Sequence, residues 1–223
     1  MYCAIIGDLV RSKKIPATQQ NAVQQKLRCA LQEINLRFAS SIAAKFLLTL
    51  GDEFQGLLHK SACSPPIITW LLGQLHPQKI RFGVGIGDMF TTIDPEKAIG
   101  ASGPAFTLAR KAIVAQKQSE TTVRTAAAEP PFSFLVRYET DAPDAALLNV
   151  GCRAAHGIVS GWTQKQWETV KAVTESGSQN KAAACLGLAD STVSRNLQAA
   201  RYEEYRAMLA QLQAYLKDTY DTR

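Results

Sequence analysis

Apolar runs in the first third of the chain alternate with a long amphipathic stretch, a pattern typical of strands and helices around one core. Apolar runs at residues 2–7 and 45–50 predict buried strands, and a turn-like "GDEF" leads into a returning strand at 55–60. Between the first two strands, residues 17–39 carry apolar side chains at helical spacing.

The following segment alternates helices and strands. Two prolines open a predicted helix at 65–75, residues 79–87 form a strand, and residues 95–117 contain a third helix. A further strand is expected at 121–126. Before the third helix, the elements follow the order β-α-β-β-α-β, which predicts an α+β fold of the ferredoxin-like kind, in which the first strand lies centrally beside the hairpin.

The C-terminal part has a different, all-helical pattern. Residues 143–160 are expected to form a connecting helix, and Thr163 is a suitable N-cap for the next one. In "SQNKAAACLGLADSTVSRNL" the spacing of Ala183, Gly187 and Val193 is typical of a helix-turn-helix. A small residue lets two helices cross, glycine takes the positive-φ turn, and a β-branched residue packs the second helix on the first.

These patterns divide the chain into three parts. Residues 1–140 are expected to be a palm-like nucleotide-binding domain, 141–161 the connecting helix, and 162–223 a helix-turn-helix domain with a final helix. The chain of 223 residues is long enough for such a division.

Composition narrows the class of protein. The sequence has no long uncharged apolar run of the kind that predicts a membrane span. The five cysteines are scattered and never spaced C-x-x-C. A disulfide framework is therefore not expected, and we expect a cytoplasmic protein. The net charge of +6 favours an anionic partner without identifying one.

Carboxylates at two turns suggest a site. Asp8 ends the first strand and Asp52 lies in the hairpin turn, so the predicted topology makes them neighbours, with Glu53 as a third acid. Closely spaced carboxylates repel unless a cation neutralises them, and Mg²⁺ or Mn²⁺ prefers such oxygen ligands. We therefore expect Asp8, Asp52 and Glu53 to be catalytic, with Asp8 and Asp52 as metal ligands. Taken alone, "GDEF" favours a plain hairpin turn.

Basic and hydroxyl side chains near these acids predict a triphosphate-binding site. They follow the first strand or lie on the third helix: Arg11, Ser12, Lys13, Lys14, Arg110 and Lys111. The basic loop is also consistent with a solvated surface. "GVGIG" at 83–87 lacks the spacing of a dinucleotide fingerprint and instead indicates close backbone packing.

The motifs "IIGDLVRSKKI", "LLTLGDEFQGLL" and "GASGPAFTLARKAI", followed by the helix-turn-helix pattern, resemble the bacterial SatD family over nearly the whole chain. The N-terminal part more distantly resembles the palm domains of GGDEF diguanylate cyclases and class III nucleotide cyclases. That resemblance maps the two metal-binding acids onto Asp8 and Asp52, the following acid onto Glu53, and a phosphate-contacting base onto Arg110. It implies a Mg- or Mn-dependent nucleotidyl cyclase or nucleotidyltransferase.

The sequence departs from the cyclase signature at two points. Leu50 stands where the signature has its first glycine, and the Asn and Asp that read guanine have no match. The resemblance therefore does not extend to guanine specificity or to synthesis of cyclic di-GMP.

The tail motif predicts DNA binding through the second helix of the pair. The residues expected to face the groove are Ser191, Thr192, Ser194, Arg195 and Gln198. Residues 161–223 contain eight Lys/Arg and seven Asp/Glu, so one copy is expected to bind weakly.

An apolar stripe on the last helix bears on the oligomeric state. Its members are spaced three or four residues apart: Tyr205, Met208, Leu209, Leu212, Tyr215 and Leu216. The stripe is consistent with a homodimer that pairs two recognition helices, or with packing on the chain's own body.

Three functions remain open from the sequence. The first is a nucleotide-binding domain that controls a DNA-binding tail, with nucleoside triphosphate and DNA as partners. The second is a DNA-binding regulator whose palm domain is an inactive scaffold. The third is a protein-interaction adaptor.

Overall fold

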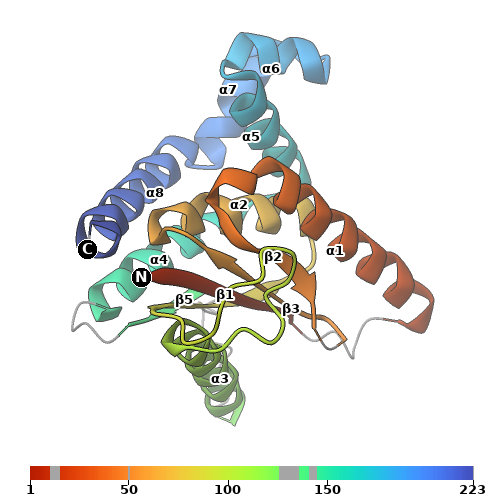
Figure 1. The fold of residues 1–223 in the computed structure, drawn as a ribbon. Coiled ribbons are helices and arrows are strands. Elements are labelled where there is room, and N and C mark those ends of the chain that lie inside the picture. The colour runs from red at the N-terminus through yellow and green to blue at the C-terminus, as the bar shows by residue number, and fades with distance from the viewer. Residues whose placement is uncertain (11–15, 50, 126–135, 141–144, 223) are drawn as a thin grey trace.

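The computed structural model describes residues 1–10, 16–49, 51–125, 136–140 and 145–222, which form a mixed α+β fold with a five-stranded sheet and a largely helical C-terminal part (Figure 1). The strands are β1 (Tyr2–Leu9), β2 (Ile42–Leu48), β3 (Glu53–Leu58), β4 (Ile80–Gly87) and β5 (Val136–Glu139). The helices are α1 (Ala17–Arg37), α2 (Ser64–Leu75), α3 (Pro104–Thr125), α4 (Ala145–Val159), α5 (Gln164–Ser176), α6 (Gln179–Leu186), α7 (Asp190–Ala199) and α8 (Tyr202–Leu216). Three short helical turns are η2 (Ala39–Ser41), η3 (Ser61–Cys63) and η4 (Lys217–Asp221). None of the helices in the described ranges is long and apolar enough to cross a membrane.

The strands lie in the order β2-β3-β1-β4-β5. β1 is antiparallel to β3 and β4, and β5 adds in parallel to β4. The predicted position of the first strand, central and beside the hairpin, is confirmed. The end of β1 therefore lies beside the start of β3, and this proximity is what the candidate site requires.

The prediction of a strand at 121–126 is wrong for residues 121–125, which continue α3, and residue 126 lies outside the described ranges. The β-branched run "TTV" favours a strand locally, but intrinsic propensity is a weak preference that a continuing helix overrides. The third helix expected within residues 95–117 begins at Pro104, where a proline is well suited to a first helical turn, and it extends to Thr125.

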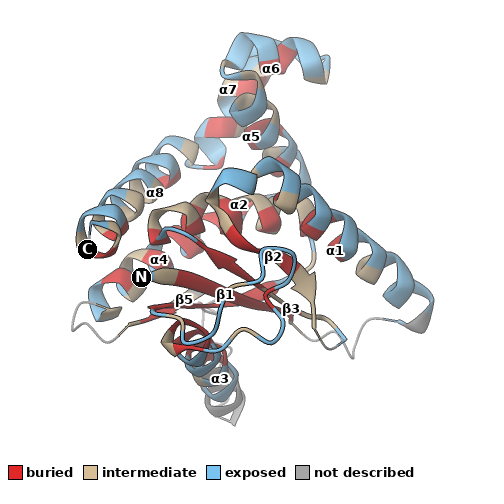
Figure 2. Cartoon of the chain, viewed as in Figure 1, coloured by how far each residue is buried: buried red, intermediate tan, exposed pale blue. Residues whose placement is uncertain are grey.

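The two faces of the sheet are covered by different helices. On one face α1, α2, α4 and α8 enclose the larger core, which includes Ile5, Phe54 and Phe82. On the other face α3 packs over a smaller core with Ala4 and Ile6 (Figures 1 and 2). Because side chains alternate along a strand, Asp8 shares the α3 face with Ala4 and Ile6.

Close packing between α3 and β4 depends on glycine. A Cβ added to Gly83 or Gly85 would overlap the carbonyl oxygens of Ala109 or Ala105 on α3. The "GVGIG" segment is therefore a track on which the helix backbone rests, and the prediction of close backbone packing is confirmed.

The C-terminal helices form their own small core around Trp162, whose ring makes edge contacts with Trp167 and Tyr205. The predicted N-cap at Thr163 is confirmed as a capping box with Gln166. Between α6 and α7, Gly187 has φ +64°, which is the left-handed turn predicted for it. Ala183 and Val193 are both buried in this core, as their spacing predicts.

The apolar stripe of α8 packs on the chain's own body. Tyr205 and Leu216 are buried, and the Tyr205 hydroxyl lies 2.8 Å from Thr69 Oγ1 on α2. In η4, which follows α8, the Asp221 carboxylate accepts hydrogen bonds from Ser61 and Ala62. The intramolecular alternative accounts for this stripe, which therefore gives no support to a homodimer.

We predict that Gly85→Ala lowers the free energy of unfolding by about 1–3 kcal/mol, the usual cost of an extra methyl group in a packed contact. The methyl group would press against the Ala105 carbonyl and push α3 away from the sheet. Urea unfolding followed by circular dichroism measures the change. Gly161→Ala is the control, because its added Cβ would lie 3.7 Å from its nearest neighbour. Equal stability of the two variants would contradict the glycine track.

Candidate functional site

Asp8 is a buried carboxylate held by two cations. It is 6% exposed and faces α3 from the end of β1. Arg81 Nη1, from the register partner of Asp8 on β4, lies 2.9 and 3.0 Å from the two carboxylate oxygens. Lys117 Nζ, from α3, lies 2.6 Å from Oδ2. Burial of this charge is tolerable because it is paired.

Glu53 is the carboxylate that the sheet places directly opposite Asp8. Its oxygens accept a bidentate pair from Arg110 on α3, at 2.5 and 2.7 Å, and Thr49 Oγ1 donates at 3.3 Å. These donors, with the Arg110 hydrogen bond as the main cause, lower the pKa of Glu53 below its usual value. The same bond raises the pKa of Arg110, so both groups are charged near neutral pH.

The "GDEF" segment is a hairpin turn, as its plainest interpretation predicts. Gly51 has φ +64°, and the Thr49 amide donates to the Glu53 carbonyl at 2.8 Å to close the turn. Asp52 is half-buried within the turn, one residue before the first paired position of β3. The register therefore assigns the acid opposite Asp8 to Glu53, while Leu50 lies outside the described residues.

A third carboxylate is paired on the same face of the sheet. Glu139 on β5 lies 2.8 Å from Arg137 Nη2 and 3.7 Å from Lys111 Nζ on α3. Together these groups form what we call the charged face: Asp8, Glu53, Glu139, Arg81, Arg110, Lys111, Lys117 and Arg137. It contains five cations and three carboxylates, and so carries an excess of positive charge.

The sequence arguments identified only part of this face. They included Asp8, Glu53, Arg110 and Lys111, and missed four members: Arg81, Lys117, Arg137 and Glu139. Of the missed residues, Lys117 left a usable signal, because it follows Arg110 by seven residues and so repeats on one side of a helix. The predicted loop residues Arg11, Ser12, Lys13 and Lys14 lie outside the described residues.

The predicted metal site does not fit the residues present. The cyclase resemblance implies Mg²⁺ or Mn²⁺ on Asp8 and Asp52, yet both Asp8 oxygens already accept from Arg81, and Oδ2 also from Lys117. A divalent ion on Asp8 would have to displace an ammonium group at contact distance. In the described ranges, no three His, Cys, Asp or Glu side chains are grouped so that they could hold a metal.

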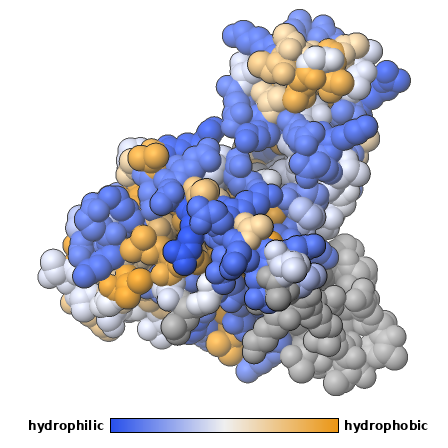
Figure 3. Space-filling view, turned by 90° about the vertical axis from the view of Figure 1, so that its right-hand side faces the viewer, coloured by the Kyte–Doolittle hydropathy of each residue, from blue (hydrophilic) through white to orange (hydrophobic). Residues whose placement is uncertain are grey.

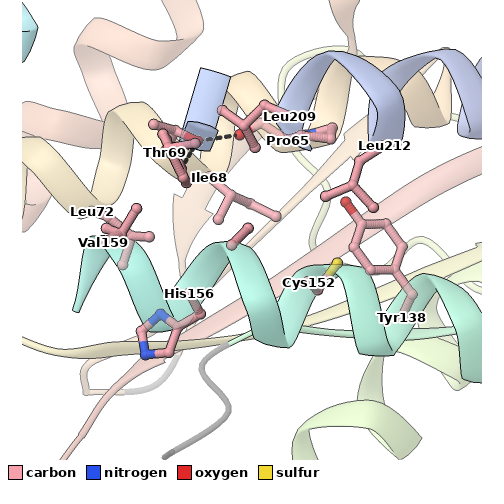
Figure 4. A pocket seen from close by; sticks show the side chains of 12 residues that line it. Pro65, Ile68, Thr69, Leu72, Tyr138, Cys152, His156, Val159, Leu209 and Leu212 are labelled. Carbon is pink, nitrogen blue, oxygen red and sulfur yellow. Dashed lines mark hydrogen bonds between the residues drawn. The ribbon is translucent and has the colours of Figure 1, made fainter. Parts of the chain in front are cut away.

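A small cavity lies elsewhere, between α2, α4 and α8 (Figure 4). Its volume is about 40 Å³, and its lining is mainly apolar, including Ile68, Leu72 and Leu212. This is room for a few water molecules and too little for a nucleotide. The charged face, rather than this cavity, is the candidate site.

The residues predicted to contact DNA lie on α7. Ser191, Arg195 and Gln198 are exposed, and Thr192 and Ser194 are half-buried. Arg195 Nε donates to the Ser191 carbonyl one turn earlier, at 3.2 Å. Val193 and Leu197 hold the opposite side of the helix in the C-terminal core.

Comparison with known proteins identifies the family. The SatD family model matches residues 2–210. The chain belongs to the SatD family. No curated protein matches it significantly. A solved structure of a bacterial light-regulated adenylyl cyclase is similar at 9% identity and a TM-score of 0.41, covering 61% of this SatD chain and 74% of the cyclase chain. A likeness of that size carries no argument about function.

We predict that the Glu53–Arg110 pair stabilises this SatD chain in a pH-dependent way. The pKa of Glu53 lies below its usual 4.5 in the folded chain, so the stabilisation is complete above that value and is lost as the pH falls through the lower, folded-state pKa. The difference in free energy of unfolding between wild type and Glu53→Gln should therefore be largest near neutral pH and shrink below pH 4.5.

Urea unfolding at a series of pH values measures this difference. Glu96→Gln is the control, because Glu96 pairs with Lys45 at an exposed site where an ion pair contributes little. A difference for Glu53→Gln that stays constant across the series would contradict the ion pair.

Proposed function

We propose that this SatD protein is a nucleotide-responsive regulator, in which the charged face binds the phosphates of a nucleotide and the C-terminal helices bind DNA. The main support for phosphate binding by the charged face is the ion pair of Arg110 with Glu53. The guanidinium is oriented by two hydrogen bonds, yet its side chain remains 45% exposed. An oriented, accessible guanidinium is suited to bidentate binding of phosphate.

Neighbouring groups support a phosphate ligand. The Lys117 and Lys111 side chains are 45% and 68% exposed, so their ammonium groups can move from carboxylate to ligand. The predicted basic loop, with Arg11, Ser12 and Lys13, begins three residues after Asp8 in the chain. A nucleoside triphosphate would satisfy more of these cations than a monophosphate.

The strand arrangement supports a ferredoxin-like palm as the scaffold. The order β2-β3-β1-β4, with α1 and α2 on one face, is the arrangement that the β-α-β-β-α-β pattern predicts. The palm domains that the sequence resembles are those of nucleotide cyclases, and that resemblance implies a cyclase or nucleotidyltransferase activity. Our proposal for this chain is binding of the nucleotide, and it includes no catalytic step.

We predict that Arg110→Ala weakens nucleotide binding about tenfold or more, because a hydrogen bond to a charged group contributes about 1.5–3 kcal/mol. Calorimetry with ATP, GTP, CTP, UTP and inorganic triphosphate measures the affinity and its dependence on the base. Arg206→Ala is the matched control, since it removes an arginine from an exposed Arg–Glu pair on α8. Absence of binding to the wild type, or equal affinities for both variants, would overturn the proposal.

DNA binding by the tail is supported by the disposition of α6 and α7. The left-handed turn at Gly187 and the buried Ala183 and Val193 hold two short helices together, as in a helix-turn-helix. Ser191, Arg195 and Gln198 then form an exposed polar row on the second helix. Such a row is suited to phosphate and base-edge contacts in a major groove.

We predict that Arg195→Ala reduces affinity for duplex DNA and lowers the salt dependence of binding by about one counterion. Fluorescence anisotropy at several salt concentrations measures both quantities. The duplexes are taken from the DNA upstream of the gene that encodes this chain, and shuffled versions of the same duplexes are used for comparison. Arg206→Ala serves again as the control, because Arg206 is on α8 outside the α6–α7 pair. If Arg195→Ala binds as the wild type does, α7 is not the DNA-reading helix.

A protein-interaction role is the second candidate for the tail. Figure 3 shows apolar side chains gathered at the outer end of the C-terminal helices. Leu188, between α6 and α7, is 40% exposed. An exposed apolar group of this kind favours a protein partner. Failure of the wild type to bind any duplex would favour this adaptor function over DNA binding.

A further inference from the structure

We propose that the ammonium group of Lys117 takes the place on Asp8 that a divalent metal would occupy, so that the charged face binds phosphate without a metal. The inference rests on the proposed function for its ligand, and on the ion pairs of the charged face for everything else. It assigns a role to Lys117, a residue that none of the sequence motifs includes.

The geometry at Asp8 leaves the carboxylate neutralised. Arg81 bonds to both oxygens, at 2.9 and 3.0 Å, and Lys117 Nζ lies 2.6 Å from Oδ2. Two unit positive charges therefore outweigh one negative charge before any ligand arrives. A metal ion brought to Oδ2 would approach an ammonium group already in contact with that oxygen, and like charges at such distances repel strongly.

The second carboxylate is engaged in the same way. Arg110 makes both close cation contacts to Glu53, as a bidentate ion pair that a metal would have to break. Lys117 also acts on Glu53, and Asp8 on Arg110, through longer-range electrostatic interactions. The two carboxylates and the two cations consequently form one cluster, in which both carboxylates, and not only one, are already engaged and unavailable to a metal. Asp52 alone is a poor ligand set for Mg²⁺.

Lys117 differs from Arg81 in what it can do next. Arg81 is 9% exposed and is fixed between two strands, whereas the Lys117 side chain is 45% exposed on a flexible stem. A lysine ammonium is a mobile point charge, so it can turn from Asp8 toward a phosphate oxygen while Arg81 keeps Asp8 paired. Asp8 thereby serves as the resting partner of a phosphate-binding lysine.

The test is Mn²⁺ binding without nucleotide, measured by electron paramagnetic resonance. In the wild type we expect no Mn²⁺ site that depends on Asp8, so Asp8→Asn should leave the titration unchanged. Lys117→Met keeps the unbranched stem and removes the charge, so we expect it to bind Mn²⁺ at least about tenfold more tightly than the wild type does. The double variant Lys117→Met with Asp8→Asn should lose this gain. Lys171→Met, at an exposed position on α5, is the matched control and should gain none.

Two outcomes would overturn the inference: a wild-type Mn²⁺ site that Asp8→Asn removes, or no gain of affinity in Lys117→Met. Asp8→Asn leaves Arg81 without its carboxylate and can fail to fold, which circular dichroism would reveal. In that case the comparison of wild type, Lys117→Met and Lys171→Met decides, and equal Mn²⁺ binding in all three, whether tight or weak, overturns the inference.

Nucleotide binding is measured separately, with EDTA and with Mg²⁺. Equal wild-type affinity in both conditions is expected, and affinity that appears only with Mg²⁺ would overturn the metal-independent site. Absence of nucleotide binding in both conditions would overturn the proposed function, while the Mn²⁺ result would still report on Lys117. The two failures are therefore distinguishable.

Discussion

The close approach of α3 to β4 is the constraint on which the rest of the candidate site depends. Gly83 and Gly85 remove the side chains that would hold the helix away from the sheet. With the helix backbone against the strand, Arg110 and Lys117 reach carboxylates that stand on β3 and β1. A helix held even a few ångström farther out would separate these charges, so one packing contact sets both the fold and the electrostatics.

The ion pairs beneath α3 fix the positions of the charged side chains more than they stabilise the fold. Desolvation of a buried ion pair offsets much of its attraction, so the Asp8–Arg81 pair adds little net stability over an apolar pair of similar volume. Each cation is instead fixed at a known position beside a strand end. Since Glu53, Asp8 and Glu139 stand on β3, β1 and β5, the cations are spread across the sheet rather than concentrated at one point.

The strands and the meeting of β1 with the hairpin could be predicted from the sequence, because period-two patterning and short connections are local signals. The identity of the acid opposite Asp8 could not be fixed in this way, since local patterning does not set the register of β1 on β3, which pairs Asp8 with Glu53 rather than Asp52. Arg81 and Lys117 were missed because they lie 73 and 109 residues from Asp8 in the chain, and no local pattern reports such pairs. The β-branched run at 121–123 is a local signal that favours a strand, and the prediction made from it is wrong because the continuing helix α3 overrides that preference.

A regulator also requires that the charged face and the tail be connected. Strand β5 carries Glu139 toward α3 and Tyr138 toward the other core, where the Tyr138 hydroxyl lies 2.8 Å from Ser64 Oγ. Ser64 in turn donates to the Ser61 carbonyl, and the amide and hydroxyl of Ser61 both donate to Asp221 after α8. Hydrogen bonds are directional, so a shift of β5 that accompanied phosphate binding would alter this chain of contacts at the end of α8. The connection from sheet to tail thus runs through buried polar groups, whose partners are specific, rather than through apolar packing alone.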